Sequence, residues 1–192
     1  VHFNYGQRTQ DRELKAFRDI CDDLEILEKY EIDIPFFTQI GASALTDKTI
    51  DVPTGGVEAG VPITYVPFRN GIFLSITAAI AEKEGATAMY IGVVQEDSSG
   101  YPDCTDEFIA DMKKAINQGT KKDTHIDILT PLVHLSKAQI VQEAMKLNVP
   151  LEHTWSCYKE EDEACGICDS CRLRLNGFKL ANQIDPIKYK AL

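Results

Sequence analysis

The sequence contains no apolar run that approaches the roughly 20 residues needed to cross a bilayer, so we expect no membrane-spanning helix. It also does not open with a charged segment followed by an apolar block, which is the pattern of a secretory signal peptide. Without such a signal, the six cysteines are expected to stay reduced, because disulfides are rare in the cytosol. We therefore expect a cytoplasmic protein.

Clusters of positive charge are also absent. The chain has 20 Lys and Arg against 30 Asp and Glu, which gives a net charge of −10 at pH 7. Proteins that bind the phosphate backbone of nucleic acids do so through grouped Lys and Arg side chains. A direct nucleic-acid partner is therefore not expected.

The length of 192 residues fits one domain with a small appendage. Hydrophobic residues make up 44% of the chain, which is enough for a large single core. No internal repeat and no low-complexity stretch breaks the sequence. We expect an α/β domain over residues 1–150 and a metal-binding segment with a helix over residues 151–192.

What the sequence does have is four cysteines within fifteen residues: Cys157, Cys165, Cys168 and Cys171. Two Cys-x-x-Cys pairs share Cys168, and this spacing lets the chain turn so that the thiolates face one point. Gly166 supplies the turn after Cys165. We predict a structural Zn²⁺ site, because four thiolates fill a tetrahedral shell and leave no position for water.

Disulfides, a redox pair and an iron–sulfur cluster are the alternatives to a zinc site for these cysteines. Disulfides are disfavoured by the absence of a secretion signal, and a redox pair needs two cysteines rather than four. An iron–sulfur cluster also uses four thiolates, and the spacing alone does not distinguish it from zinc. Catalysis is in either case expected elsewhere in the chain.

Strands and helices alternate along the chain, which predicts a doubly wound parallel sheet of Rossmann-like α/β type. The expected strands cover residues 1–5, 32–37, 88–94 and 126–129. The expected helices lie within residues 14–27, 72–81, 106–119, 136–145 and 173–180. Leu24 and Leu27 are placed on the apolar face of the first helix, and the second is expected to be buried all round.

Several helix ends and one strand carry specific expectations. Gly85 is expected to end the second helix, Asp106 to cap the third, and Ser136 with Gln139 to form a capping box. The apolar run 88–94 is expected to be a central strand covered on both faces. Residues 41–62 are predicted to form a long functional loop.

Ligands bind beyond the carboxyl ends of the strands in such sheets, so polar residues there are the candidates. Arg69 and Asn70 precede a helix whose N-terminus adds donors for an anion; the alternatives are a surface ion pair and a helix cap. Glu96 and Asp97 follow the central strand and could hold Mg²⁺, bind a guanidine-like edge of a ligand or help to deprotonate ammonium; the alternative is a solvated acidic loop.

Further candidates lie in the same loop and after the cysteines. Tyr101 and Asp103 suit a purine-like edge, by stacking and by accepting N–H bonds. Cys104 is interpreted as a structural thiol, because no partner histidine is identifiable. Arg172 and Arg174 follow the last cysteine and are expected to offset the net negative charge of a four-thiolate site.

Four stretches together resemble one family: 3–8 (FNYGQR), 66–70 (VPFRN), 92–104 (GVVQEDSSGYPDC) and the cysteine segment 157–174. In this order they are similar to the 7-cyano-7-deazaguanine synthase family of queuosine biosynthesis, which belongs to the ATP pyrophosphatases. The resemblance implies an adenine-nucleotide alpha-hydrolase-like fold. The family begins with a strand and a Ser-Gly-Gly-x-Asp-Ser phosphate loop that this sequence does not contain; the sequence opens where the family's second strand would end.

The resemblance also implies an activity and its ligands. The expected reaction converts 7-carboxy-7-deazaguanine and ammonia to 7-cyano-7-deazaguanine at the expense of ATP with Mg²⁺, through adenylated intermediates. Tyr5, Gly6 and Gln7 lie where the family places its nucleotide, although a simple strand-to-helix turn explains them equally well. A homodimer is expected from the same resemblance.

Two other functions compete with this one. A related ATP pyrophosphatase that thiolates tRNA would need a reactive cysteine and a basic surface, and the charge of −10 argues against it. A non-enzymatic zinc-ribbon interaction module would need no phosphate loop, but it would not explain the polar loop 95–104 after a core strand.

Overall fold

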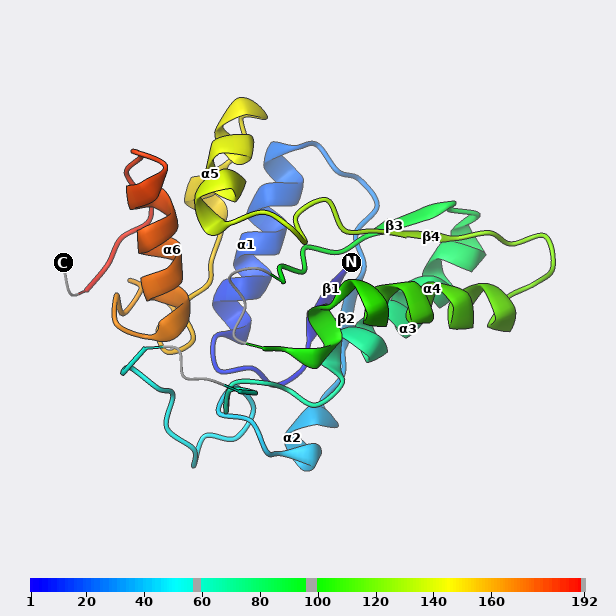
Figure 1. The fold of residues 1–192 in the computed structure, drawn as a ribbon, viewed down its shortest axis with the longest axis horizontal. Helices are drawn as coiled ribbons and strands as arrows, with labels where there is room; N and C mark the ends of the chain where they lie inside the picture. Colours follow the sequence, from blue (N-terminus) through cyan, green and yellow to red (C-terminus); the bar gives the residue numbers. More distant parts are fainter. Residues whose placement is uncertain (57–59, 96–99, 191–192) are drawn as a thin grey trace. The chain divides into compact units, whose positions relative to one another are not determined.

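A computed structural model describes residues 1–56, 60–95 and 100–190 of the chain. The chain forms two compact units. The first unit contains both ends of the chain, Val1–Pro67 and Ser136–Leu192, and the second is the continuous middle segment Phe68–Leu135. Figure 1 colours the chain from one end to the other, and each unit is described by itself below.

The first unit opens with the predicted strand, helix and second strand. β1 (His2–Asn4) pairs in parallel with β2 (Glu31–Asp33), with Phe3 opposite Ile32. Between them runs α1 (Gln10–Asp23), which buries Ala16 and Cys21. The prediction that Leu24 and Leu27 extend the apolar face is wrong, because the helix ends before them and they are 54% and 90% exposed.

The predicted strand over 32–37 is too long. β2 ends at Asp33, and Phe37 begins a short helix, α2 (Phe37–Ile40), in which its side chain is fully buried. Pro35 lies between the two elements, where its missing N–H and fixed φ end the strand. Residues 41–56 and 60–62 form a loop without helix or strand, as predicted for this part of the chain.

The remainder of the first unit is helical. α5 (Lys137–Lys146) packs against α6 (Asp169–Leu180), and the turn η2 (Leu151–His153) lies between them in the sequence. The capping box of Ser136 and Gln139 is present. The two helices bury Val141, Phe178 and Ala181 against one another.

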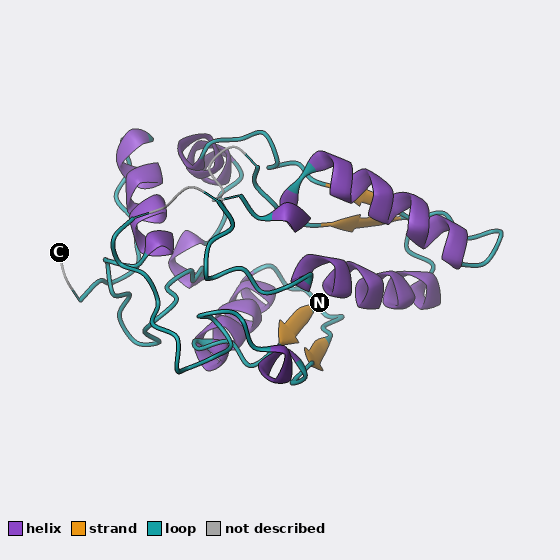
Figure 2. Cartoon of the chain, turned by 60° about the horizontal axis from the view of Figure 1, so that its bottom comes forward, coloured by secondary structure: helices purple, strands orange, loops and turns teal. Residues whose placement is uncertain are grey.

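The second unit repeats the pairing of two short parallel strands with helices. Its elements are α3 (Arg69–Glu84), β3 (Ala88–Tyr90), η1 (Pro102–Cys104), α4 (Asp106–Gly119) and β4 (Asp127–Leu129). Met89 lies opposite Ile128 in the β3–β4 pair. Figure 2 shows these strands alongside the two long helices. Their shared core contains Leu74, Ala78, Met89, Ile109, Ile116, Ile126 and Ile128.

Three expectations about this unit need correction. The helix expected to be buried all round buries only one side, and Ile72, Ile76 and Ile80 are half-buried. The expected strand 88–94 pairs only as far as Tyr90, whose side chain is 74% exposed, so β3 is not covered on both faces. Gly85 does end α3, as predicted.

The cap of α4 is also one residue away from its predicted position. Thr105 rather than Asp106 is the N-cap, because its hydroxyl accepts the N–H of Phe108 at 3.2 Å. Asp106 is the first helical residue, where its charge still favours the helix N-terminus.

Parallel pairing and the α/β class are confirmed, whereas a doubly wound sheet is not. Within the described ranges, each unit holds one two-stranded parallel sheet. The predicted division of the chain near residue 150 stays a prediction. Among residues 1–56, 60–95 and 100–190, no helix is both long enough and apolar enough to cross a membrane.

Candidate metal centre and active-site residues

The four clustered cysteines meet at one point in the first unit. Their sulfur atoms all lie within 4.8 Å of one another, and each residue is at most 6% exposed. A single ion with metal–sulfur bonds of about 2.3 Å in tetrahedral geometry would separate its sulfurs by about 3.8 Å. The Sγ atoms of Cys165 and Cys171 are 3.9 Å apart, and all four cysteines are free of disulfides.

Local structure places the sulfurs. Gly166 has φ of 73°, which a side chain rarely adopts, and this turn brings Cys168 back toward Cys165. Cys168 is the N-cap of α6, and Cys171 follows in its first turn. Backbone N–H groups of Lys159 and Cys165 donate to Cys157 Sγ at 3.4 and 3.3 Å. Such donors stabilise thiolate charge, as metal-binding sulfurs require.

The surroundings of the cysteines are apolar. Ala44, Val52 and Ala164 are buried with them, and Trp155, Tyr158, Ile187 and Tyr189 pack against the group. Hydrogen bonds from the thiols of Cys168 and Cys171 lower the pKa of Cys157. The group therefore combines soft donors with a water-poor pocket, which suits a bound metal ion.

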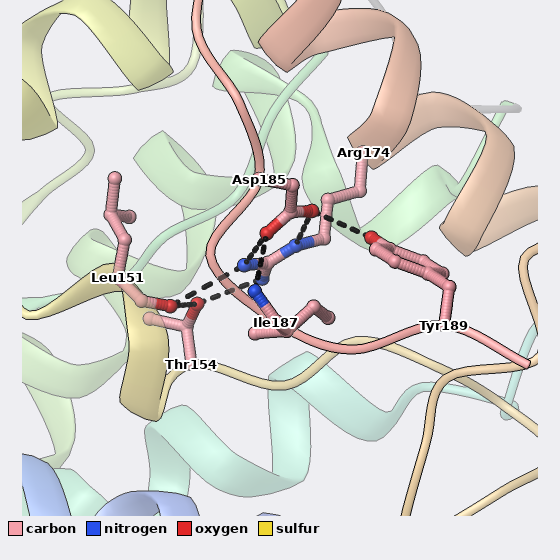
Figure 3. A network of polar contacts seen from close by, with 6 residues as sticks. All are labelled: Leu151, Thr154, Arg174, Asp185, Ile187 and Tyr189. Atoms are coloured by element: carbon pink, nitrogen blue, oxygen red, sulfur yellow. Dashed lines mark hydrogen bonds and ion pairs between the residues drawn. The ribbon is translucent and has the colours of Figure 1, made fainter. Parts of the chain in front are cut away.

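Arg174 does not offset charge at the cysteines, contrary to the expectation. Its Nε and Nη2 atoms donate to the two carboxylate oxygens of Asp185 at 2.7 and 2.8 Å, and Nη1 donates to Thr154 Oγ1 at 2.8 Å (Figure 3). The side chains of Arg174 and Asp185 are only 13% and 3% exposed. Arg172 likewise donates to the carbonyl of Ile167, at 3.0 Å.

Tyr189 completes this network from the end of the described chain. Its hydroxyl donates to Asp185 Oδ2 at 2.6 Å (Figure 3). Burial raises the pKa of Tyr189, and the neighbouring Asp185 carboxylate raises it further. The sequence did not indicate Asp185 or Tyr189, because neither lies in a motif and the fold alone shows that both face Arg174.

In the second unit, Arg69 and Asn70 begin α3, and Asp103 reaches them from η1. The N–H of Asn70 donates to Asp103 Oδ2 at 2.9 Å, and its side-chain amide donates to the Asp103 carbonyl at 3.2 Å. Arg69 Nη2 lies 3.4 Å from Asn70 Oδ1. The structure thus brings these three predicted residues together, with Asp103 only 4% exposed.

Cys104 belongs to the same group. It accepts from Asn70 Nδ2 at 3.3 Å, and its pKa is raised to about 11 by burial and by the Asp103 carboxylate. A thiol with this pKa stays protonated at neutral pH and is a poor nucleophile, which agrees with its interpretation as structural. Tyr101 is partly buried against the core of the unit. Glu96 and Asp97 lie outside the described residues.

Tyr5, Gly6 and Gln7 form the turn between β1 and α1 in the first unit. Tyr5 is buried, with its ring edge-on to Phe37 at 5.8 Å. The Gln7 side chain turns inward, accepting the N–H of Tyr5 at 2.9 Å and donating to Glu13 at 3.2 Å. Gly6 has φ of 82° and packs directly against Thr38.

Arg8 is an organising residue that sequence reasoning missed. Its Nε donates to the carbonyl of Ala44 at 2.6 Å, and Nη2 donates to those of Asp47 and Ile50 at 3.0 and 2.6 Å. One guanidinium therefore fixes three carbonyls of the loop that follows α2. The position of Arg8 directly after the 3–7 turn was the only available signal.

Comparison with known proteins agrees with the resemblance seen in the sequence. A family described as queuosine biosynthesis protein QueC matches residues 1–182. A 7-cyano-7-deazaguanine synthase from Aliarcobacter butzleri is 86% identical over 190 residues, which cover 99% of this chain and 83% of that protein. Proteins of the same name from Nautilia profundicola and Sulfurovum sp. are 70% and 67% identical, each over 99% of this chain and 86% of their own length.

Proposed function

The chain belongs to the QueC family of queuosine biosynthesis proteins, and from this membership we propose that it converts 7-carboxy-7-deazaguanine and ammonia to 7-cyano-7-deazaguanine with ATP. The observation that carries the proposal is the 86% identity, over nearly the whole chain, to a protein named 7-cyano-7-deazaguanine synthase. The family resemblance predicted from the four sequence motifs is thereby confirmed, and so is the prediction of an enzyme.

The reaction needs two activations of one carbon. A carboxylate resists attack by ammonia because its oxygen is a poor leaving group. Attack of that oxygen on the α-phosphate of ATP releases pyrophosphate and gives an acyl adenylate, in which AMP is a good leaving group. Ammonia then displaces AMP and forms the amide. A second adenylation, on the amide oxygen, allows AMP to leave again with loss of the N–H protons, and the nitrile remains. Negative charge develops at the carbonyl oxygen and on the pyrophosphate, where fixed donors and Mg²⁺ are most useful.

Arg69 and Asn70 are proposed to hold the substrate carboxylate or a phosphate. They stand at the N-terminus of a helix of 16 residues, whose positive dipole end favours an anion. Asp103 supports this arrangement, since its contact with the N–H of Asn70 fixes the start of the helix.

The base is proposed to be recognised by Tyr101 and Asp103. Asp103 uses Oδ2 for the helix, and Oδ1 accepts the Cys104 thiol at 3.8 Å; the second lone pair of Oδ1 is proposed to accept an N–H from a guanine-like edge. Glu96 and Asp97 are proposed as the acidic pair that receives Mg²⁺.

ATP is proposed to contact the turn Tyr5–Gly6–Gln7. The N–H of Tyr5 already donates to Gln7, and the N–H of Gly6 donates to Gln10 Oε1 at 3.3 Å. The adenine contacts that we propose therefore fall to the carbonyl oxygens of this turn, which can accept from the exocyclic amine of adenine.

The four cysteines are proposed to bind one structural Zn²⁺. Four sulfurs within 4.8 Å fit a single ion, whereas a cluster of several irons would hold its cysteines on the outside and farther apart. With four thiolates, the ion has no open position and serves to hold residues 157–171 in place. Elemental analysis of protein purified without chelator checks the identity, and one zinc per chain is expected.

The location and the assembly of the protein also remain proposals. We infer a cytoplasmic homodimer that binds small molecules and no nucleic acid directly. The thiolation of tRNA is disfavoured, since four cysteines converge on one point, Cys21 is buried in α1 and the pKa of Cys104 is raised to about 11. No described cysteine has the low-pKa, exposed setting that a sulfur carrier needs.

The deciding experiment follows AMP release and the mass of the base in a mixture of full-length enzyme, ATP, Mg²⁺, ammonium and 7-carboxy-7-deazaguanine. AMP that forms only with this base, together with the nitrile mass, is expected.

Arg69→Ala should lower kcat/KM by about a hundredfold or more if Arg69 holds a reacting anion. Arg18→Ala is the matched control, because Arg18 is an exposed arginine paired with Glu31 and should leave turnover unchanged. Equal turnover of the two variants would show that Arg69 does not bind a reacting group. Absence of AMP with the wild-type enzyme would contradict the proposed activity.

A further inference from the structure

We propose that residues 185–190 act as a clasp over the metal centre, held shut by the Arg174–Asp185 ion pair, and that metal leaves the protein through opening of this clasp rather than through unfolding of the whole unit. The inference rests on the proposed metal ion and goes beyond it, because it assigns to a segment without any metal ligand the control of metal retention.

The clasp is anchored at its first residue. Asp185 receives both donors of the Arg174 fork, the Tyr189 hydroxyl and the N–H of Ile187, the last at 3.3 Å (Figure 3). All lone pairs of one buried carboxylate are therefore engaged: two of the four bonds join α6 to the clasp, and two lie within the clasp. Breaking one partner of such a buried pair leaves the other charge unpaired in a water-poor site, which is strongly unfavourable.

The far end of the clasp is attached to the cysteine segment directly. Ala164 pairs with Tyr189 as a short parallel bridge, in which Ala164 N–H donates to the Lys188 carbonyl and Lys190 N–H donates to the Ala164 carbonyl, both at 2.9 Å. Ala164 immediately precedes the ligand Cys165. Ile187 and Tyr189 also pack against the cysteines, so the clasp contributes to their burial.

The connection between α6 and the clasp is exposed at residues 182–184 and, within the described chain, bonded to α6 only through the N–H groups of Asn182 and Gln183, so we expect the clasp to open beyond it. Ile184 is 91% exposed and Leu180 62% exposed, and a groove of 440 Å³ separates part of α6 from residues 183–189. Segments with few buried contacts open locally, well below the free energy of global unfolding. The Arg174–Asp185 pair and the bridge to Ala164 are the bonds that oppose this opening.

The test measures the rate at which the zinc-loaded full chain loses metal to an excess of a coloured chelator. Asp185→Asn is expected to release metal at least tenfold faster than wild type, and Tyr189→Phe, which removes one hydroxyl and keeps the packing, about three- to tenfold faster. Lys190→Gln is the control within the clasp, because it removes only an exposed ion pair with Glu160 and should leave the rate unchanged.

A second control separates the clasp from general instability. Val141→Ala weakens the α5–α6 packing in the same unit and should lower the denaturation midpoint without changing metal release. Hydrogen exchange at residues 185–190 should accelerate in Asp185→Asn and Tyr189→Phe but not in Val141→Ala. If the rate of metal release correlates with the denaturation midpoint across the four variants, general stability explains the release and the clasp proposal is wrong.

The metal content of the purified chain, measured before the chelator is added, distinguishes a failure of the clasp proposal from a failure of the proposed metal centre. A chain purified without stoichiometric metal would overturn the metal centre itself. One metal per chain with identical release rates in wild type, Asp185→Asn and Tyr189→Phe would overturn only the clasp.

Discussion

Both the backbone conformation of Gly6 and its contact with a neighbouring side chain require glycine at this position. Its φ of 82° disfavours any side chain, and an added Cβ would overlap the Cγ2 methyl of Thr38. That methyl cannot rotate away freely, because Thr38 Oγ1 donates to the Pro35 carbonyl at 2.8 Å. The turn before α1 therefore requires glycine for two separate physical reasons.

We predict that Gly6→Ala lowers the free energy of unfolding by about 2–4 kcal/mol, of which about 1 kcal/mol comes from the positive φ and the rest from the overlap. Urea denaturation measures the loss. Thr38→Ser in the same chain should recover part of it, since serine keeps the hydroxyl and removes the methyl. Gly55→Ala is the control, because its Cβ would meet nothing within 4 Å. A double variant no more stable than Gly6→Ala would contradict the steric explanation.

At this scale, sequence reasoning predicted residues whose chemistry is local. The four cysteines could be identified from their spacing alone, and the structure gathers their sulfur atoms. Asp185 and Arg8 could not be identified, because a single carboxylate or guanidinium belongs to no motif and its partners are set by the fold, for Arg8 more than thirty residues away. For Arg174 the motif suggested the wrong partner, since the carboxylate of Asp185 competes better for a guanidinium than sulfur does.

At the scale of elements, helix ends were more predictable than strand lengths. Gly85 and the capping box of Ser136 and Gln139 act through bonds within a few residues, so the local sequence determines them. Residues 91–94 and Phe37 were wrongly placed in strands because of their apolar neighbours. Strand extent depends on a pairing partner, however, and each strand here has one neighbour of three residues.

The capping box of α5 gives a testable prediction for an element. In Ser136→Ala the N–H of Gln139 loses its acceptor, which lies at 3.3 Å in the native protein. We expect the free energy of unfolding to fall by about 1 kcal/mol. Chemical denaturation with Ser136→Asp as the companion variant checks it, because aspartate is also a good cap and should restore stability. A Ser136→Asp variant as unstable as Ser136→Ala would show that the cap is not the cause.

At the scale of the molecule, the two units have separate cores, and the four clustered cysteines lie in only one of them. Ala44 and Val52 pack with this cluster in the first unit, whereas the core around Leu74 and Ile126 holds Cys104 and none of the four. Loss of the metal should therefore act on one unit selectively.

We predict that a strong chelator increases amide exchange of residues 154–190 by roughly a hundredfold, because four buried thiols then lose the ion that holds them. Residues 70–94 and 105–133 should retain most of their protection. Hydrogen exchange followed by mass spectrometry distinguishes the two segments, and readdition of zinc should reverse the change. Equal loss of protection in both segments would mean that the metal supports the whole molecule.

The interrupted first unit has a consequence for how the protein is made. On the ribosome, Val1–Pro67 emerges before Ser136–Leu192 but completes its contacts only with it, because the Thr9 hydroxyl donates to the Cys157 carbonyl and Ala44 packs with the clustered cysteines. Phe68–Leu135 is continuous and can fold while synthesis continues. The expected order of maturation is then Phe68–Leu135, the two outer segments and the proposed metal ion. Scarcity of that ion would leave nascent chains with a folded Phe68–Leu135 and an incompletely folded Val1–Pro67, on which chaperones and proteases can act.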